Sequence, residues 1–159
     1  MTSPHLHDGL RLVATQSAIN CAGLFVVSTL TKWGARGILL DAVLVTEELV
    51  TNAVKATGVM EARVDWNELT RIEFITVRLL GFEASIRIEV WDSAPNPPLL
   101  PDEAGSSIKR GSYPTPRGKV VWAELAVYPH RSSTPQPPAE QFGQDPDLLR
   151  RMRDGLEDL

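Results

Sequence analysis

The stretch TEELVTNAVKAT, Thr46 to Thr57, lies within a run of residues that favours a helix. Asn52 stands in the middle of it, although Asn is a weak helix former that costs roughly half a kcal/mol relative to Ala. We predict a helix over residues 42–57, with Asp41 as its N-cap and Gly58 as the residue that ends it. A residue that the helix itself does not favour indicates a role outside helix formation.

The predicted helix has two different faces. Its apolar residues recur at helical spacing and form a stripe for core packing: Ala42, Val45, Leu49, Ala53 and Ala56. Glu48, Asn52 and Lys55 share a different face, because they are spaced by about one helical turn. This polar face carries an acid, an amide and a cation in line.

The N-terminal part predicts a second helix behind a loose tail. Residues 1–12 show no clear period, and we expect a tail there. Ser17 is the expected N-cap of a helix over residues 18–32, which Gly34 ends. The tail is therefore expected to precede the folded domain, which we place at residues 13–128.

Apolar segments later in the chain predict antiparallel strands. Residues 71–80 and 84–92 form a hairpin across a short link, and the second of these strands ends at Asp92. Another strand, GKVVWAELAV, begins at Gly118, and residues 112–116 form a short arm leading into it. The fold class is therefore α+β: a two-layer α/β sandwich with helices packed on one face of a mixed, mostly antiparallel sheet.

The C-terminal part differs in composition from the predicted domain. Residues 129–144 are rich in proline and predict a linker. Residues 145–159 are charged and predict a short terminal helix. We expect neither segment to belong to the sandwich.

The composition narrows the function classes. The 159 residues are 43% hydrophobic, but no run approaches the roughly 20 apolar residues that cross a bilayer, so no membrane span is expected. The net charge is −4 and no basic stripe is present, which argues against nucleic-acid binding. The single cysteine cannot form an internal disulfide, and no signal-peptide pattern opens the chain. A cytoplasmic protein is the expectation.

Two segments together carry a resemblance to a known family. The helix segment ELVTNAVK, followed by a strand that ends as VWDSAPNPP, resembles the histidine-kinase-like ATPase superfamily, whose fold is called the Bergerat or GHKL fold. The chain resembles most closely the ATP-binding anti-sigma regulatory factors, which are single-domain serine kinases. The resemblance covers about residues 17–127. It implies a shortened Bergerat fold that binds ATP and Mg²⁺.

The resemblance implies roles for the polar face of the helix. Asn52 would be the Mg²⁺ ligand, since Mg²⁺ takes oxygen ligands and an amide carbonyl adds no charge. Glu48 would be the catalytic base that orients and deprotonates the attacking hydroxyl. Lys55 would meet a phosphate as a point charge.

The resemblance also implies roles at the end of the strand. Asp92 would accept a hydrogen bond from the adenine amino group. Ala94 and Asn96 stand where the family's D-x-G-x-G motif has its glycines, which let the backbone approach the nucleotide. Both are therefore expected at the nucleotide, although neither is a glycine.

A second motif of the family is missing. Relatives carry a G-R-G-L motif that opens a helix whose N-terminal amides hold the phosphates. Between the aspartate and the last strand, this chain has only Gly105–Ile108 and Lys109–Gly111, without a helix-forming apolar run. We expect the ATP lid and most of the third helix to be deleted, ATP binding to be weakened, and the uncovered sheet to expose apolar side chains to a partner or to a second copy of the chain.

Two functions of different classes are consistent with these residues. The first is a serine kinase that binds ATP and phosphorylates an antagonist protein. The second is a degenerate ATPase domain that captures a sigma factor or an antagonist without turnover. A shortened and marginally stable product is a third possibility. The intact helix motif favours the kinase, and the missing lid favours the binding module.

Overall fold

The computed structural model describes residues 3–58, 72–98 and 107–127. Contacts divide the chain into two units, Met1–Tyr128 and Pro129–Leu159, and the described residues all belong to the first. The predicted linker and the predicted terminal helix lie outside the described residues.

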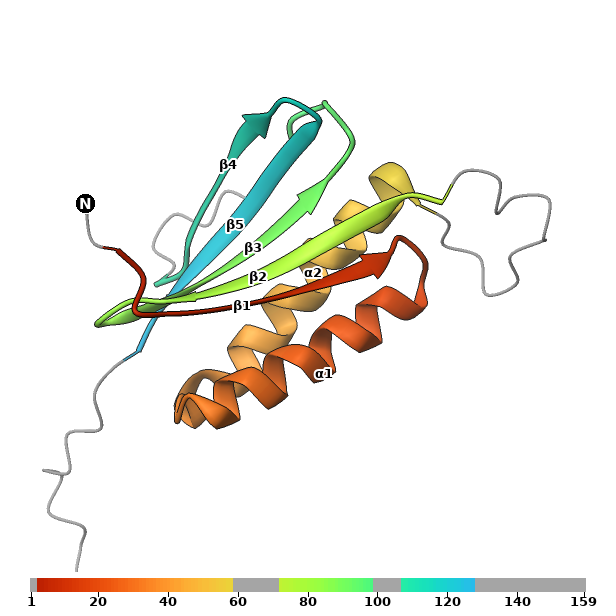
Figure 1. Ribbon diagram of the computed structural model, residues 1–159. Helices are drawn as coiled ribbons and strands as arrows, with labels where there is room; N and C mark the ends of the chain where they lie inside the picture. The colour runs from red at the N-terminus through yellow and green to blue at the C-terminus, as the bar shows by residue number, and fades with distance from the viewer. Residues whose placement is uncertain (1–2, 59–71, 99–106, 128–159) are drawn as a thin grey trace, which may run out of the picture. The chain divides into compact units, whose positions relative to one another are not determined.

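The first unit has two layers (Figure 1). One layer is an antiparallel sheet of five strands in the order β1-β2-β3-β5-β4. The strands are β1 (Leu6–Val13), β2 (Phe74–Gly81), β3 (Ser85–Asp92), β4 (Lys109–Thr115) and β5 (Gly118–Ala126). The other layer holds α1 (Ser17–Lys32), the short 3-10 helix η1 (Arg36–Ile38) and α2 (Leu39–Thr57). The predicted α+β sandwich is confirmed, and every strand pair is antiparallel rather than part of a mixed sheet.

The helix ends differ from the prediction at two caps. α2 begins at Leu39, because η1 leads the backbone directly into it, and Asp41 lies in the first turn rather than at the cap. An acid in the first turn is still favourable at the positive end of the helix dipole. Ser17 is likewise the first residue of α1, and its hydroxyl contacts the Thr15 hydroxyl at 2.8 Å instead of capping the helix.

The prediction of a loose tail over residues 1–12 is wrong. Most of that segment forms β1, which pairs with β2 along its whole length. β1 is an edge strand, so its residues are only half-buried or exposed, and the apolar alternation that marks a strand is weak. Leu10 and Leu12 face the helices, while Asp8 on the same side pairs with Lys32 of α1 at 3.5 Å.

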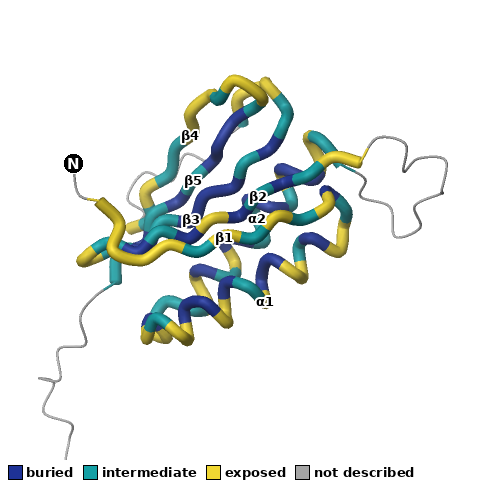
Figure 2. The backbone as a smooth tube through the Cα atoms, viewed as in Figure 1, coloured by how far each residue is buried: buried dark blue, intermediate teal, exposed yellow. Residues whose placement is uncertain are grey.

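The core lies between the helices and the inner face of the sheet (Figure 2). Both helices supply residues with no exposed surface, Val26 and Leu30 from α1 and Val50 and Val54 from α2. Ala56 departs from the predicted stripe, since it is exposed at the last turn. Gly58 then ends the helix beside Ala14, the residue that follows β1. A Cβ at Gly58 would lie 1.9 Å from the carbonyl oxygen of Ala14, so only glycine permits this approach.

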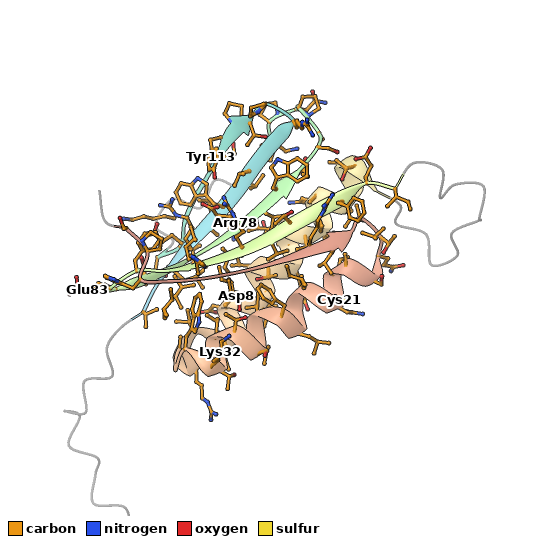
Figure 3. All side chains as sticks on the ribbon, viewed as in Figure 1. Asp8, Cys21, Lys32, Arg78, Glu83 and Tyr113 are labelled. Carbon is orange, nitrogen blue, oxygen red and sulfur yellow. The ribbon has the colours of Figure 1, made fainter. Side chains whose placement is uncertain are left out.

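The outer face of the sheet, on the side away from the helices, carries paired charged side chains and aromatic rings. Arg87 lies 4.5 Å above the Trp122 ring and pairs with Glu124 at 2.9 Å. Arg78 pairs with Glu89 and, at 3.4 Å, reaches the hydroxyl of Tyr113 (Figure 3). Charged pairs and aromatic rings therefore cover this face, because the long stems of arginine pack on rings while their heads pair with acids.

Candidate functional site

A cavity of about 300 Å³ opens between α2 and the inner side of β3, β4 and β5. The helix, the sheet and the segment after β3 each contribute both polar and apolar groups to its lining. The lining residues are Glu48, Leu49, Asn52, Ala53, Ala56, Val90, Asp92, Ala94, Asn96, Pro97, Pro98, Arg110, Lys119 and Val121. A concave site with apolar walls and a few convergent polar groups is the usual form of a small-molecule site.

Five of the six residues that sequence analysis assigned to a site line this cavity. Glu48 and Asn52 reach it from successive turns of α2, because residues four apart share a helix face. Lys55 is the exception: it is exposed and does not belong to the lining. The structure therefore brings the acid and the amide of the predicted polar face to the cavity, and leaves the cation outside it.

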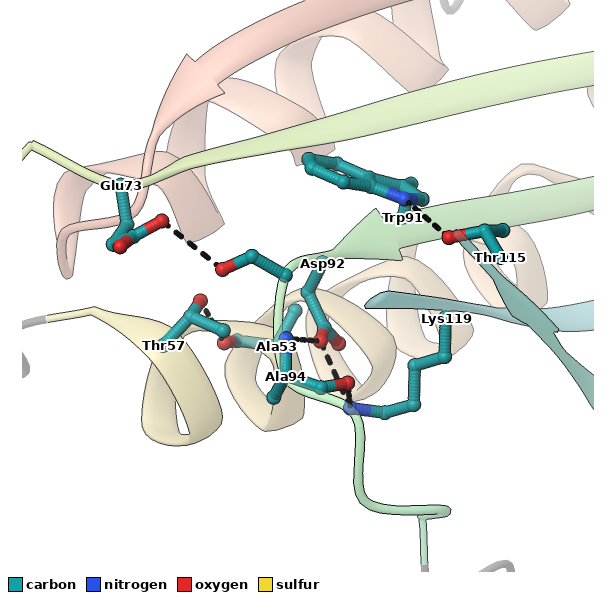
Figure 4. A network of polar contacts seen from close by, with 9 residues as sticks. Ala53, Thr57, Glu73, Trp91, Asp92, Ala94, Thr115 and Lys119 are labelled. Carbon is teal, nitrogen blue, oxygen red and sulfur yellow. Dashed lines mark hydrogen bonds and ion pairs between the residues drawn. The ribbon is translucent and has the colours of Figure 1, made fainter. Parts of the chain in front are cut away.

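One end of the cavity is built on Asp92, the last residue of β3, of which 1% is exposed. Its Oδ1 accepts a hydrogen bond from the Ala94 amide at 2.9 Å and one from Lys119 Nζ at 2.8 Å (Figure 4). Lys119 also donates to the carbonyl oxygen of Ala94 at 3.1 Å, and only 6% of it is exposed. Asn96 lines the cavity from the exposed segment just after this turn. A carboxylate and an ammonium thus form a buried ion pair at this end.

The start of β5 makes that pair possible. Asp92 and Lys119 are register partners of β3 and β5. Gly118 has φ 147, and a Cβ there would lie 1.9 Å from the carbonyl oxygen of Asp92. Only glycine fits both the conformation and the space. The side chain of Lys119 then points to the same side as the buried Val121, toward α2.

A second ion pair lies at the other end of the cavity. Arg110 donates from Nη1 to Glu48 Oε1 and from Nη2 to Oε2, both at 3.2 Å. The Arg110 side chain is 9% exposed and that of Glu48 is 39% exposed. Arg110 lies on β4 opposite Ala123, on the side of the sheet that faces the helices. The pair connects β4 with α2 by the two-pronged geometry that arginine favours with carboxylates.

Sequence reasoning missed both cations, although each left a signal. Lys119 shares its parity along β5 with Val121, Ala123 and Leu125, so it occupies an inward position among apolar residues. Arg110 follows from the hairpin register: Thr115 pairs with Gly118, and counting back along both strands sets Arg110 opposite an inward residue. A charged residue at an inward strand position indicates a buried partner or a ligand.

Among the described residues, the cavity lining contains two carboxylates and two cations, each carboxylate paired with one cation. In the part of the chain that the structure describes, no three His, Cys, Asp or Glu side chains gather as a metal site. Mg²⁺ commonly binds through one or two protein oxygens and takes its other ligands from phosphates and water. Asn52 fits that limited role, because its side chain is exposed at the cavity and needs to supply only one oxygen.

The chain matches no protein-family model and none of the curated proteins. Within the described ranges, no helix has the length and apolar character that crossing a membrane requires.

Proposed function

We propose that this cavity binds ATP and that the chain is a regulatory protein of the anti-sigma factor, serine-kinase type. The observation that carries the proposal is that Glu48, Asn52 and Asp92 line the same cavity. Asp92 is 40 residues or more away in sequence from the two residues on α2. These three residues have the types and the sequence order that the resemblance requires, and they line one cavity. A Bergerat-type identity for the sandwich belongs to the same proposal.

Each residue has a part that its position supports. The buried Asp92 carboxylate would accept a hydrogen bond from the adenine amino group, against walls formed by Val90 and Val121. Asn52 would give one oxygen to Mg²⁺, which would neutralise phosphate charge. Glu48 would accept the proton of a serine hydroxyl on a partner protein, once its carboxylate is released from its ion pair. The proposed setting is cytoplasmic, with a sigma factor or its antagonist as partner and with a homodimer as a possible assembly.

A second candidate function has its own supporting observation. Both carboxylates of the described lining are paired with cations. Glu48, the proposed proton acceptor, is held by Arg110, and Asp92, the proposed acceptor of the adenine hydrogen bond, is held by Lys119. A degenerate ATPase domain that captures a protein partner without turnover would tolerate this neutralised site. The two functions differ in whether phosphate is ever transferred.

Calorimetric titration with a non-hydrolysable ATP analogue, with and without Mg²⁺, tests the proposal. We expect Asn52→Ala to lower affinity by about tenfold, equivalent to about 1.4 kcal/mol, with Mg²⁺ and by much less without it. Asn20→Ala makes the same change on the exposed face of α1 and serves as the matched control with unchanged affinity. Absence of any nucleotide binding by the wild-type protein would refute the proposal. Phosphate transfer to a partner, lost in Glu48→Gln, separates the kinase from the binding module.

A further inference from the structure

Arg110 stands out among the cavity residues because it is a cation held inside the site by a partner that water can reach. Its guanidinium is almost buried, whereas the Glu48 carboxylate that holds it is more than a third exposed. Arg110 lies on β4 and Glu48 lies on α2, and the two residues are 62 positions apart in sequence. Arg110 is therefore placed at the cavity by the fold and not by local sequence.

We propose that Arg110 is the phosphate ligand of this site and that it exchanges Glu48 for the phosphates when a nucleotide binds. This inference rests on the proposed nucleotide-binding function. It assigns to a strand residue the task for which this sequence has no glycine-rich helix start. Guanidinium groups bind phosphate oxygens with the same two-pronged geometry that Arg110 already uses with the Glu48 carboxylate.

The exchange is energetically accessible because of which partner is exposed. Splitting an ion pair is costly when both charges lose their neighbours in a buried setting. Here the Glu48 carboxylate can be hydrated where it stands, and Arg110 gains an anion with more charge than the one it leaves. Because the backbone of Arg110 belongs to β4, the exchange would take place by a swing of the guanidinium at the end of its side chain.

The two cations of the cavity are placed for different parts of a ligand. Lys119 is opposite Asp92 at one end, and Arg110 is opposite Ala123. Four residues along β5 separate these positions, which is roughly 13 Å at the rise of a strand. A nucleoside triphosphate is long enough to reach from one to the other. With its base at Asp92, its phosphates would lie toward Arg110 and Asn52.

The exchange also changes the state of Glu48. While Arg110 donates to both of its oxygens, the Glu48 carboxylate is engaged within the ion pair and is not directed at a substrate hydroxyl. Phosphate binding at Arg110 would free it. Arrival of the triphosphate would therefore prepare the base, and the site would remain inactive without ligand.

The test is a series of titrations with adenosine, AMP, ADP and a non-hydrolysable ATP analogue, monitored by calorimetry. We expect Arg110→Met to weaken triphosphate binding by about tenfold or more, ADP binding by less, and adenosine binding not at all. Arg87→Met, which removes the same group from an ion pair on the outer face of the sheet, is the matched control and should change none of the four affinities.

Two results would overturn the inference while leaving the proposed function standing. An equal loss for adenosine and triphosphate would show that Arg110 only shapes the cavity, and an unchanged triphosphate affinity would show that it does not meet the phosphates. Failure of the wild-type protein to bind any of the four ligands would instead refute the proposed function itself.

A second measurement keeps the test independent of how well Arg110→Met folds. Arginine Nε–H signals can be followed by NMR in the wild-type protein, and the Arg110 signal is assigned by its disappearance in Arg110→Lys. We expect this signal to shift with the ATP analogue and not with adenosine. A signal that responds equally to both ligands, or to neither, would contradict the exchange.

Discussion

The two ends of the cavity both pair a carboxylate with a cation, yet the two pairs differ in exposure. At one end, the side chains of Asp92 and Lys119 are 2% and 8% exposed, and the ammonium also contacts a backbone carbonyl. At the other end, Arg110 is nearly buried but Glu48 is 39% exposed. Burial of both charges makes the first pair part of the architecture, whereas the second retains access to water.

This difference separates a fixed group from an exchangeable one. Removing one member of a fully buried pair leaves a charge without compensation, which is far more costly than breaking a pair that water can hydrate. A ligand can therefore displace the partner of Arg110 more readily than the partner of Asp92. The stability of matched variants measures this contrast directly.

Lys119→Met should have the largest effect. The substitution keeps most of the side-chain volume but leaves Asp92 buried without its cation, which costs about 3–5 kcal/mol of unfolding free energy. Denaturant unfolding monitored by circular dichroism gives this value. A loss below about 1 kcal/mol would show that the buried pair is no more fixed than a surface pair.

The double variant Asp92→Asn/Lys119→Met is the control for that measurement. It removes both charges, and the Asn carbonyl oxygen can still accept the hydrogen bond from the Ala94 amide. We expect it to be more stable than Lys119→Met alone, because the penalty comes from an unpaired charge. If the double variant is less stable than the single one, desolvation of Asp92 is not the cause.

Gly118→Ala should disturb the same end by a smaller amount. A methyl group at φ 147 would collide with the carbonyl oxygen of Asp92, so the start of β5 must shift at a cost of about 1–3 kcal/mol. Gly37→Ala is the matched control, since its Cβ would meet no atom within 4 Å. Thermal unfolding of the two variants compares them, and equal melting temperatures would show that the close approach is not needed.

The part of the site that sequence predicted is the part set by local geometry. Glu48 and Asn52 share a face because a helix repeats every 3.6 residues, and that period holds whatever the tertiary fold. The strand that ends at Asp92 was likewise predicted from its own alternation and confirmed. Their meeting at one cavity depends on packing of α2 against the sheet, and only the structure shows it.

The parts that sequence missed depend on register and on edges. Arg110 and Lys119 acquire their partners through strand pairing, and a shift of one residue would turn both side chains to the opposite face. The sequence of β1 does not predict a strand, because an edge strand buries little and shows a weak period. The cap at Asp41 was misplaced because η1 extends the helical path by contacts that propensity does not encode.

Arg110→Met should have a small effect on stability, in contrast to the large effect expected for Lys119→Met. The Met side chain replaces part of the packing of the arginine stem, and the exposed Glu48 regains water, so we expect a loss of about 1 kcal/mol or less. Thermal unfolding without ligand measures it. A loss as large as that of Lys119→Met would make Arg110 an architectural residue and would remove the basis for exchange.

The ion pair of Arg87 with Glu124 lies on the outer face of the sheet. The two side chains are 30% and 21% exposed, so this pair can be compared with the two pairs of the cavity. Burial raises the pKa of Glu124, but hydrogen bonds from Arg87 and Ser85 outweigh it, so the pKa lies below its ordinary value of 4.5. A depressed carboxyl pKa stabilises the fold above the unfolded-state value, and this contribution is lost as pH falls through the folded-state value.

Glu124→Gln should therefore be less stable than the wild type at neutral pH, by an amount smaller than for the cavity variants. The difference should shrink as pH falls below about 4.5, because the wild-type carboxyl becomes protonated and loses the same charge. Denaturant unfolding at a series of pH values follows this convergence, with Glu83→Gln in the exposed turn as the matched control. A difference that stays constant down to acidic pH would mean that the Gln amide disturbs packing, and that charge is not what holds the outer pair.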